Sequence, residues 1–544
     1  MPGLNLASCW ESIADALPDR PALVHGDRRV TWCELDERSA RLASAFADLG
    51  LGPDSKVALY LYNSNEYMEA TNAAFKLRAA HVNVNYRYLE DELEYLLDNA
   101  DAEVLVFHGA LGDQVAKVRD RLPQLRAVIQ VDDGSDLVDG ALRFEDAILS
   151  HDPMPRVERT GDELYILYTG GTTGMPKGVM WRNEDLYHAL APATFGLVGE
   201  AVPDDPRDVG GAAARVASSG LTPVHVPASP LMHGTGFMTT VQTMLLGGTV
   251  VTLEQRHFDA HELWRVVEQE HVTQMAIVGD AFAKPMVRAL EEAEARGEPY
   301  ELSSLRLMVS SGVMWSAPVK EALLQRGSFL CFDSLGSSEG VGFAGSISAS
   351  GSEVRTARFT IGEHTKVLTE DGRAIEPGSD EIGLLALSGP LPLGYYKDPD
   401  KSAATFRTFA GVRYSIPGDW ARVAADGSVE LLGRGSVSIN TGGEKVFPEE
   451  VEEALKLHDG VADALVVGVP DDRFGEAVTA VVTARAGTTL DADDVKQAVR
   501  KHLAAFKQPR RIVVVDAIPR GPNGKADYAW ARRTALEELG VTPE

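Results

Sequence analysis

Short apolar runs alternate with amphipathic stretches along most of the chain. The runs are rich in Val, Ile and Leu, as in residues 103–109 and 274–279, and indicate buried strands. Between them, stretches such as 91–100 and 258–272 carry apolar residues three and four positions apart, which is typical of amphipathic helices. This alternation predicts an α/β fold of sheets covered by helices, and a length of 544 residues predicts at least two domains.

The pattern changes after Gly433. Pro448 opens a predicted helix with Glu449 and Glu450 in its first turn, where carboxylates favour a helix N-terminus. The sequence therefore predicts a large N-terminal domain, 1–433, and a small α+β domain, 434–544. The other elements expected in the small domain are strands within 464–469, 477–485 and 511–518 and a helix within 491–507 that Pro509 ends.

Two stretches lack a regular hydrophobic period. Residues 432–443 are rich in Gly and Ser, which suits a hinge between the two domains. Residues 199–220 are rich in Gly, Ala, Pro and Asp and are predicted to form a surface loop. The alternative for this loop is a cover over a substrate entrance.

The net charge of −28 disfavours nucleic acids and anionic membranes as partners, because both are negatively charged. Cys9, Cys33 and Cys331 are too few and too scattered for a disulfide framework or a zinc site. The N-terminus lacks the basic start and apolar run of a signal peptide, and no apolar stretch is long enough to span a bilayer. We therefore expect a soluble cytoplasmic protein without an integral membrane span, and the sequence leaves a homodimer open.

The string YTGGTTGMPKGVM, residues 168–180, follows a predicted strand. Glycines let backbone N–H groups approach phosphates closely, while Thr172 and Thr173 add hydroxyl donors and Lys177 adds a positive charge. The glycine spacing differs from the usual P-loop, and Gly178 stands where a P-loop has Ser or Thr. The string predicts a phosphate site of another type, with a plain glycine-rich turn as the alternative.

This string is similar to the signature of the adenylate-forming superfamily, which includes acyl-CoA synthetases, luciferases and peptide-synthetase adenylation domains. Further segments resemble the other motifs of that family, in the family's order and over essentially the full chain. They are residues 230–237, 310–315, 332–340, 416–420, 432–437, 441–455 and 519–528.

The resemblance implies ATP, Mg²⁺ and coenzyme A as cofactor and co-substrates. Lys525, Glu339 and His233 are the implied catalytic positions, with Glu339 and Thr169 holding the metal ion. Asp419 is implied at the ribose, Arg434 at ribose or phosphate, and the small domain is implied to be mobile, rotating after adenylation to withdraw Lys525. The remaining implied nucleotide and coenzyme A positions are Gly170, Gly171, Thr172, Thr173, Lys177, Gly312, Val313, Met314, Asp333, Ser334, Leu335, Gly336, Ser337, Ser338, Lys445, Gly442 and Gly443.

The implied acyl pocket is lined mainly by small or apolar residues, which suits a bulky hydrophobic acid better than acetate. Its positions are His233, Gly234, Thr235, Gly236, Phe237, Val278, Gly279 and Gly340. Asp280 is predicted to cap the following helix, with a role as partner of a substrate ammonium as the alternative.

Several positions depart from the commonest family pattern. Leu335 replaces an aromatic residue that stacks on adenine, Pro417 replaces a threonine, Ser338 replaces a threonine, and Ser436 stands at a hinge position that is usually acidic or Lys. With these changes the chain resembles an actinobacterial branch of CoA ligases acting on steroid side-chain or polycyclic acids.

The predicted function is therefore an ATP-dependent acyl-CoA synthetase acting on a small-molecule carboxylic acid. One alternative is an adenylation-only enzyme that hands the acyl group to a carrier protein or a separate ligase. A second, from another class, is a non-catalytic nucleotide- or acyl-binding protein. A luciferase-like monooxygenase would need the same adenylate, but no segment points to oxygen chemistry.

Overall fold

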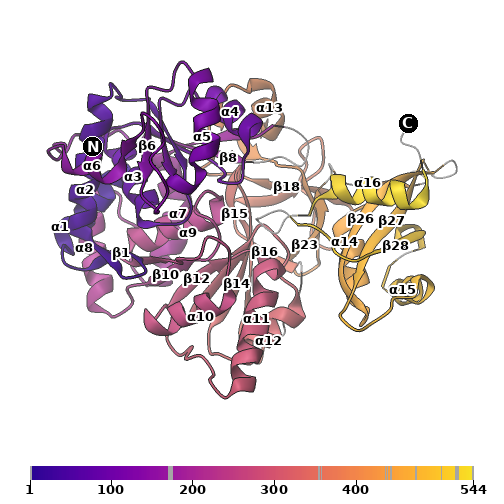
Figure 1. Cartoon of the computed structure of the whole chain (residues 1–544). Coiled ribbons are helices and arrows are strands. Elements are labelled where there is room, and N and C mark those ends of the chain that lie inside the picture. Colours follow the sequence, from indigo (N-terminus) through magenta and orange to yellow (C-terminus); the bar gives the residue numbers. More distant parts are fainter. Residues whose placement is uncertain are drawn as a thin grey trace. The chain divides into compact units, whose positions relative to one another are not determined.

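The computed structural model describes residues 3–541 except 170–174, 353, 355, 357, 435–436, 438, 442–443, 472–474, 501, 504 and 521–525 (Figure 1). The side chains of residues 434, 440, 444–445, 475 and 506 are also outside the description. The chain divides into two compact units. Unit 1 is Met1–Thr356 with Ser388–Ser415, and unit 2 is Ala357–Leu387 with Ile416–Glu544.

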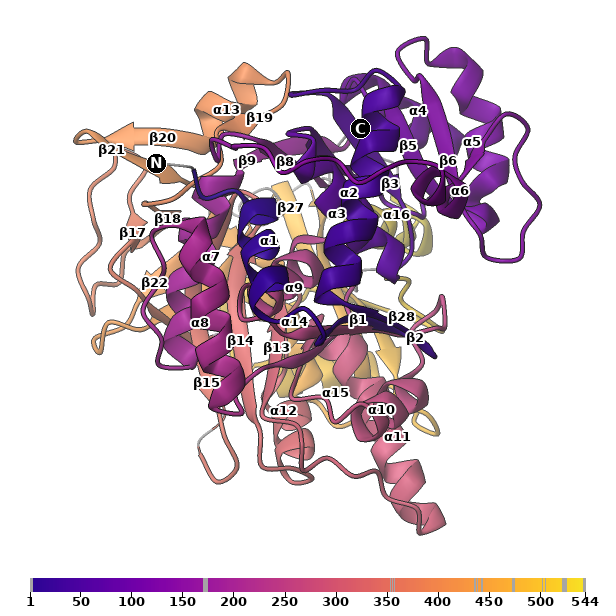
Figure 2. The same cartoon turned by 90° about the vertical axis from the view of Figure 1, so that its left-hand side faces the viewer.

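Unit 1 contains two largely parallel sheets, which confirms the α/β prediction (Figure 2). Within this unit, sheet A runs in the order β2-β1-β11-β10-β12-β13-β14-β15, with parallel pairing from β1 through β14. Its strands are β1 Pro21–His25, β2 Arg28–Thr31, β10 Val224–Pro227, β11 Thr249–Thr252, β12 Gln274–Ile277, β13 Leu307–Ser311, β14 Leu330–Ser337 and β15 Gly340–Ser348.

Sheet B runs in the order β19-β9-β8-β4-β3-β5-β6-β7 and is parallel from β8 through β7. Its strands are β3 Lys56–Tyr60, β4 Ala80–Asn83, β5 Val104–His108, β6 Ala127–Val131, β7 Leu142–Arg143, β8 Leu164–Thr169, β9 Lys177–Arg182 and β19 Gly394–Tyr395. The strands β20 Phe406–Phe409 and β21 Val412–Ser415 form a hairpin in the same unit.

Helices cover both faces of sheet B, which explains why its strands are apolar at successive positions. Val57 and Leu59 pack with residues of α1, α2 and α3, whereas Ala58 and Tyr60 face α4 and α5 on the other side. The helices of unit 1 are α1 Leu6–Ala16, α2 Trp32–Asp48, α3 Asn65–Lys76, α4 Glu90–Asn99, α5 Gly112–Val118, α6 Phe144–Leu149, α7 Asn183–Leu197, α8 Pro206–Ser218, α9 Gly234–Leu245, α10 Ala260–Gln269, α11 Gly279–Arg296, α12 Ala317–Leu324 and α13 Pro399–Thr405, with 3₁₀ turns η1 Gly109–Leu111 and η2 Arg119–Arg121.

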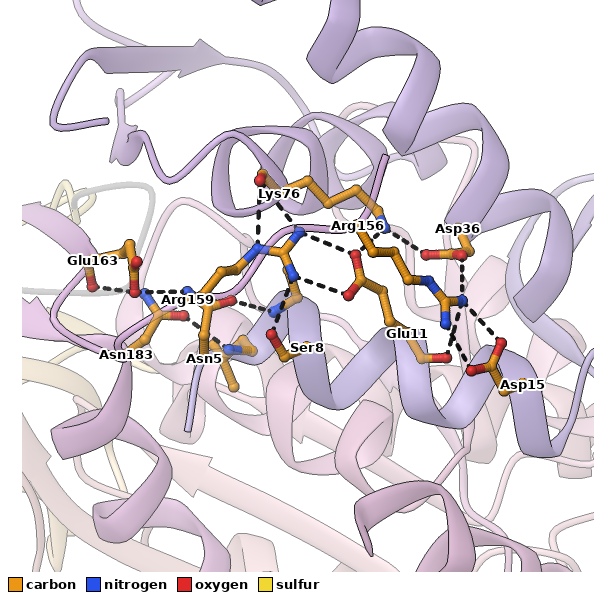
Figure 3. A network of polar contacts seen from close by, with 12 residues as sticks. Asn5, Ser8, Glu11, Asp15, Asp36, Lys76, Arg156, Arg159, Glu163 and Asn183 are labelled. Carbon is orange, nitrogen blue, oxygen red and sulfur yellow. Dashed lines mark hydrogen bonds and ion pairs between the residues drawn. The ribbon is translucent and has the colours of Figure 1, made fainter. Parts of the chain in front are cut away.

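A buried ion network attaches the N-terminal helix α1 to sheet B (Figure 3). The Glu11 carboxylate accepts hydrogen bonds from Lys76 Nζ at 2.7 Å and from Arg159 Nη1 at 2.9 Å. Nearby, Glu163 accepts from Asn5 Nδ2 at 3.1 Å. Because charges of both signs are buried together, each is compensated, and the network ties α1 to the residue that precedes β8.

The prediction of a surface loop over residues 199–220 is wrong, because α8 occupies most of this stretch and lies beside α1 (Figure 2). Asp205 caps the helix by accepting from Arg207 N, and Pro206 suits its first turn. The buried side of α8 has the helical period but consists of small residues. These are Val209, Ala212, Ala213 and Val216.

Gly210 of α8 lies close against α1, and Gly210→Ala is expected to disturb this contact. An added Cβ would collide with the Ser12 carbonyl, whose carbon would be 2.6 Å away, and Ser12 Oγ already bonds both Gly210 N and Arg207 O. Such overpacking costs about 1–3 kcal/mol. Hydrogen exchange of the α1 and α8 amides should therefore accelerate.

The matched control is Gly211→Ala in the same helix. Its added Cβ would meet only Arg215 Nη1, at 3.7 Å, so the better helix propensity of alanine should slow exchange in α8. Equal exchange rates in the two variants would contradict the close approach at Gly210.

Unit 2 contains an antiparallel sheet C, in the order β17-β18-β22-β23-β16, and a sheet D, in the order β25-β24-β27-β26 with β28 parallel to β27. Helices α14 and α15 pack on one face of sheet D and α16 packs on the other. The strands are β16 Arg358–Ile361, β17 Thr365–Leu368, β18 Ile382–Leu387, β22 Asp419–Val423, β23 Val429–Arg434, β24 Ile439–Thr441, β25 Glu444–Val446, β26 Val461–Asp471, β27 Gly475–Ala484 and β28 Arg511–Val515. The helices are α14 Pro448–Lys456, α15 Ala492–Val499 and α16 Tyr528–Leu539, with a 3₁₀ turn η4 Ala505–Lys507.

The helix expected within 491–507 is shorter than predicted, because α15 ends at Val499. Lys507 Nζ contacts both carboxylate oxygens of Glu450 on α14, at 2.5 and 2.7 Å, and this contact anchors the 3₁₀ turn that precedes Pro509. The domain boundary after residue 433 would separate sheet C from sheet D, and it remains a prediction.

The described helices include none that is both long and apolar enough to cross a bilayer. Cys9 and Cys331 are buried and Cys33 is exposed, and all three are free thiols. Burial raises the pKa of the Cys331 thiol to about 12, which is typical of a cysteine that packs in the core.

Candidate active site

The glycine-rich string is bracketed by two paired strands. Strand β8 leads into it and β9 leaves it antiparallel, with Thr169 opposite Lys177 and Tyr168 opposite Gly178. A Cβ at Gly178 would lie 2.6 Å from the Tyr168 ring, which explains the glycine. The predicted phosphate positions Gly170, Gly171, Thr172 and Thr173 lie outside the described residues, but the register brings both ends of the string together.

Lys177 is held by residues that the sequence analysis missed. Its Nζ lies 2.7 Å from Asp398 Oδ2 and 5.9 Å from the centre of the Tyr395 ring. The hydrogen bond from Lys177 is the main cause of a pKa of Asp398 below its usual value. The available signal was Asp398-Pro399, a helix start, where Asp398 also caps α13 by accepting from Lys401 N at 3.0 Å.

The predicted metal ligand Glu339 sits at the turn between β14 and β15, and Tyr395 Oη donates to its Oε1 at 2.7 Å. Trp181 Nε1 donates to Ser338 O at 3.0 Å and so attaches the same turn to β9. A carboxylate held in this way fits Mg²⁺, which takes oxygen ligands and retains phosphate oxygens and water. In the described part of the chain, no group of three or more His, Cys, Asp or Glu side chains could hold a metal ion by itself.

Two asparagines near the ends of strands of sheet B support the predicted acyl segment: Asn83 ends β4 and Asn63 lies in the loop after β3. Asn83 Oδ1 accepts from Tyr168 N at 2.6 Å, and its Nδ2 donates to the carbonyls of Tyr168 and Met232. Asn63 Nδ2 donates to the carbonyls of Pro227 and Ser229, at 2.9 and 3.2 Å. Hydrogen bonds thus join the strand before the glycine-rich string to the segment that ends at His233, the residue that precedes α9.

Replacing Asn83 with alanine is expected to lower acyl-adenylate formation by about 10²-fold, because small displacements of reacting groups have effects of this size. The buried carbonyls of Tyr168 and Met232 would lose their amide donor, and the Michaelis constants for ATP and the acid should both rise. The measurement is acid-dependent pyrophosphate release. Asn72→Ala is the control, since Asn72 is equally buried and its Oδ1 makes no hydrogen bond within the described residues. Equal activity of the two variants would contradict a positioning role for Asn83.

Further predicted acyl-pocket and nucleotide positions lie at the carboxyl ends of the strands of sheet A, where parallel sheets usually bind ligands. His233, Gly234 and Thr235 follow β10, Val278 and Gly279 follow β12, and Gly312, Val313 and Met314 follow β13. In β14, Ser334 pairs with Ser311 of β13, which places Leu335 and Gly336 at the carboxyl edge of sheet A. Ser337 pairs with Gly340 across the turn that carries Glu339. Phe237 is instead fully buried and stacks on Tyr165 with ring centres 4.3 Å apart, which supports packing rather than a place at the pocket surface.

Asp280 binds a neighbouring loop instead of capping α11, so the capping prediction is wrong. Its carboxylate accepts from Ser316 N at 2.9 Å and from Ser316 Oγ at 2.8 Å, and its own N–H donates to Met314 O. Gly279 has φ +48°, and a Cβ there would lie 2.6 Å from Val313 O. These contacts hold the loop after β13. Because the Asp280 carboxylate already accepts hydrogen bonds from Ser316, its geometry does not support binding of a substrate ammonium group.

Asp333 is buried at the face of β14 that points toward α12. Lys320 Nζ lies 3.4 Å from Asp333 Oδ2, and both side chains are almost fully buried. Burial raises the pKa of Asp333 to about 6, although the charge of Lys320 opposes the rise. Asp333, a predicted nucleotide position, therefore carries a buried titratable carboxyl group that is paired with Lys320.

In unit 2, Asp419 begins β22 and its backbone pairs with that of Arg434 at the end of β23. The two predicted ribose-site residues are thus neighbours in sheet C, although the Arg434 side chain is outside the description. Lys445 lies in β25, and its side chain is likewise not described. Gly442, Gly443, Ser436 and Lys525 lie outside the described residues.

The sequence matches the family model of AMP-binding enzymes over residues 10–396 and that of the AMP-binding enzyme C-terminal domain over 450–525. It is 44% identical to a 3-oxocholest-4-en-26-oate–CoA ligase of Rhodococcus rhodochrous, over 99% of this chain and 97% of the relative. It is also 44% identical to a medium/long-chain-fatty-acid–CoA/3-oxocholest-4-en-26-oate–CoA ligase of Mycobacterium tuberculosis, over 97% of this chain and 96% of the relative.

Solved structures show the same fold. An anthranilate CoA ligase in complex with anthranoyl-AMP superposes with a TM-score of 0.84 at 21% identity, covering 100% of this chain and 99% of that one. A benzoate CoA ligase from Burkholderia xenovorans gives a TM-score of 0.78 at 23% identity, covering 97% and 99%. With the family models matching both parts of the chain, this protein belongs to the family of AMP-binding enzymes.

Proposed function

We propose that the chain is an ATP-dependent, AMP-forming acyl-CoA synthetase that acts on a bulky hydrophobic carboxylic acid. The observation that carries this proposal is 44% identity, over nearly the whole chain, to CoA ligases named for 3-oxocholest-4-en-26-oate and for medium- and long-chain fatty acids. The small and apolar residues at the carboxyl edge of sheet A support an acid of this kind. We also place the enzyme in the cytoplasm. The sequence leaves a homodimer open, and light scattering would decide it.

In the first half-reaction a carboxylate oxygen of the acid attacks the α-phosphorus of ATP. The bond from that phosphorus to the bridging oxygen breaks, and pyrophosphate leaves with the bonding electrons. Lys177 and Lys525 offset the repulsion between the carboxylate and the phosphates, and Asp419 and Arg434 hold the ribose. Glu339 and Thr169 would hold the metal ion. Bound Mg²⁺ neutralises charge on the phosphate oxygens.

In the second half-reaction the sulfur of coenzyme A attacks the acyl carbon, the bond to AMP breaks, and the thiol proton passes to solvent. AMP is a good leaving group, so this step requires no nucleophilic side chain. The buried Cys331 is therefore left without a catalytic role in this mechanism.

The test is pyrophosphate release with ATP and Mg²⁺ across 3-oxocholest-4-en-26-oic acid, medium- and long-chain fatty acids, and aryl acids, with and without coenzyme A. Pyrophosphate together with the mass of an acyl-CoA supports the proposal and ranks the acids. Pyrophosphate without a thioester would favour an adenylation-only enzyme, and no ATP turnover with any acid would favour a binding protein.

A further inference from the structure

A buried lysine of α12 lies between two segments that carry predicted nucleotide positions. The buried residues of this helix are Lys320, Leu323 and Leu324. Positions three and four apart on a helix form one buried stripe, which is normally apolar. Lysine is almost never buried to this degree unless it is paired, because removing its charge from water is costly. The contacts of Lys320 therefore have to compensate its charge.

Lys320 contacts both strand β14 and the loop that precedes α12. Its Nζ lies 3.4 Å from Asp333 Oδ2 and 5.8 Å from the centre of the Trp315 ring. The side chains of Lys320 and Asp333 are 1% and 9% exposed, and Trp315 is fully buried. A cation at this distance from an aromatic ring is attracted to the face of the ring. One ammonium group thus joins Trp315 of the loop to Asp333 of β14.

This loop, residues 312–316, connects β13 to α12. Its predicted nucleotide positions are Gly312, Val313 and Met314. Asp280 of α11 holds one side of the loop, because it accepts from Ser316 N at 2.9 Å and donates its own N–H to Met314 O at 3.1 Å. Lys320 holds the loop against β14, where Asp333 directly precedes the predicted nucleotide position Ser334. The loop is therefore fixed from two sides by charged side chains.

We propose that Lys320 is a positioning residue for ATP binding, which holds the loop 312–316 against β14 through its contacts with Trp315 and Asp333. The inference rests on the proposed function, in which this loop and the end of β14 bind the nucleotide. That mechanism assigns the reacting phosphate to Lys177, Lys525 and the metal ion rather than to the loop. Loss of the Lys320 charge should therefore weaken ATP binding and leave the rate at saturating ATP unchanged.

The test compares three variants with the parent. Lys320→Met removes the charge and keeps an unbranched side chain. Lys284→Met is the matched control, since Lys284 forms an ion pair of the same length, 3.4 Å, with Asp280 but is 44% exposed. Exposed pairs of this kind contribute little. The double variant Lys320→Met with Asp333→Asn removes both charges, so that no uncompensated charge stays buried.

Two measurements report on the nucleotide. Isothermal titration calorimetry follows binding of α,β-methylene-ATP, which cannot release pyrophosphate and requires no acid. Acid-dependent pyrophosphate release gives the Michaelis constant for ATP and the maximal rate. Thermal unfolding reports the stability of each variant, which separates a displaced loop from a destabilised fold.

Lys320→Met is expected to weaken binding of the analogue and to raise the Michaelis constant for ATP by about 10-fold, because small displacements of binding groups have large effects. The maximal rate should stay within about twofold of the parent. Lys284→Met should match the parent in both measurements. The double variant should unfold close to the parent temperature and still bind the analogue about 10-fold more weakly, which an effect on stability alone would not produce.

Parental affinity in either Lys320→Met or the double variant would overturn the inference. If Lys320→Met does not fold, the double variant decides the question by itself. If the parent binds the analogue but releases pyrophosphate with no acid, the proposed function fails, and calorimetry still decides whether Lys320 positions the nucleotide site. A parent that does not bind the analogue would overturn the proposed function and this inference together.

Discussion

Lys525→Ala is expected to reduce the rate of acyl-adenylate formation by about 10²–10³-fold, the effect of removing one preorganised charged donor from a transition state. The physical reason is repulsion, because the carboxylate and the α-phosphate are both anionic and a cation between them is worth most as the new bond forms. The measurement is acid-dependent pyrophosphate release under single-turnover conditions. Thioester formation from a synthetic adenylate should change far less.

Lys496→Ala provides the control for a lost positive charge in the same unit. Lys496 lies on α15 and pairs with Asp493 at 3.6 Å, so its removal should leave both half-reactions unchanged. A comparable loss in both half-reactions of Lys525→Ala would contradict a role confined to adenylation, and would indicate instead that the substitution disturbs the unit as a whole.

Glu339→Gln is expected to lower adenylation by at least about 10²-fold and to raise the Mg²⁺ concentration needed for half-maximal rate, because a neutral amide is a much weaker ligand for a hard cation. Tyr395→Phe should weaken metal binding by about 10-fold, since Tyr395 only orients the carboxylate. Electron paramagnetic resonance of Mn²⁺ with ATP and enzyme measures metal binding independently of turnover.

The neighbouring Tyr396 supplies the control, because its hydroxyl bonds to Asp101 at 2.8 Å rather than to Glu339. Tyr396→Phe should leave the Mg²⁺ dependence unchanged. In the Glu339→Gln background, Tyr395→Phe should have little further effect, since both changes act on one ligand. Additive effects of the two changes would show that Tyr395 acts elsewhere.

Much of the fold follows from local patterns. The strands β5, β8 and β12 and the helices α4, α10 and α14 coincide with predicted stretches, because side-chain periodicity and helix-start residues are local features of the sequence. Prediction failed at α8, whose buried side consists of small residues, and at α15, which ends at Val499, well before Pro509.

The residues of the candidate site likewise fall into those that motifs indicated and those that only the structure revealed. Motif spacing pointed to Lys177 and Glu339. Of their partners, Tyr395 has no motif of its own, and Asp398 stands only in a helix start, which gives no indication that it would hold Lys177. The role of Asn83 could not be predicted from the sequence either. A single asparagine at the end of an apolar run does not indicate that its amide will donate to two carbonyls far away in the chain.

By itself, the sequence determined the α/β class and the adenylate-forming family, and it singled out Lys177 and Glu339 as predicted site residues. Only the tertiary structure decided which side chains hold those residues in place. The contacts join positions far apart in the chain, 221 residues for Lys177 with Asp398 and 56 for Glu339 with Tyr395. Such partners come together only when the sheets pack and their strands pair in register. The hydrophobic period of a short stretch of sequence does not specify that packing.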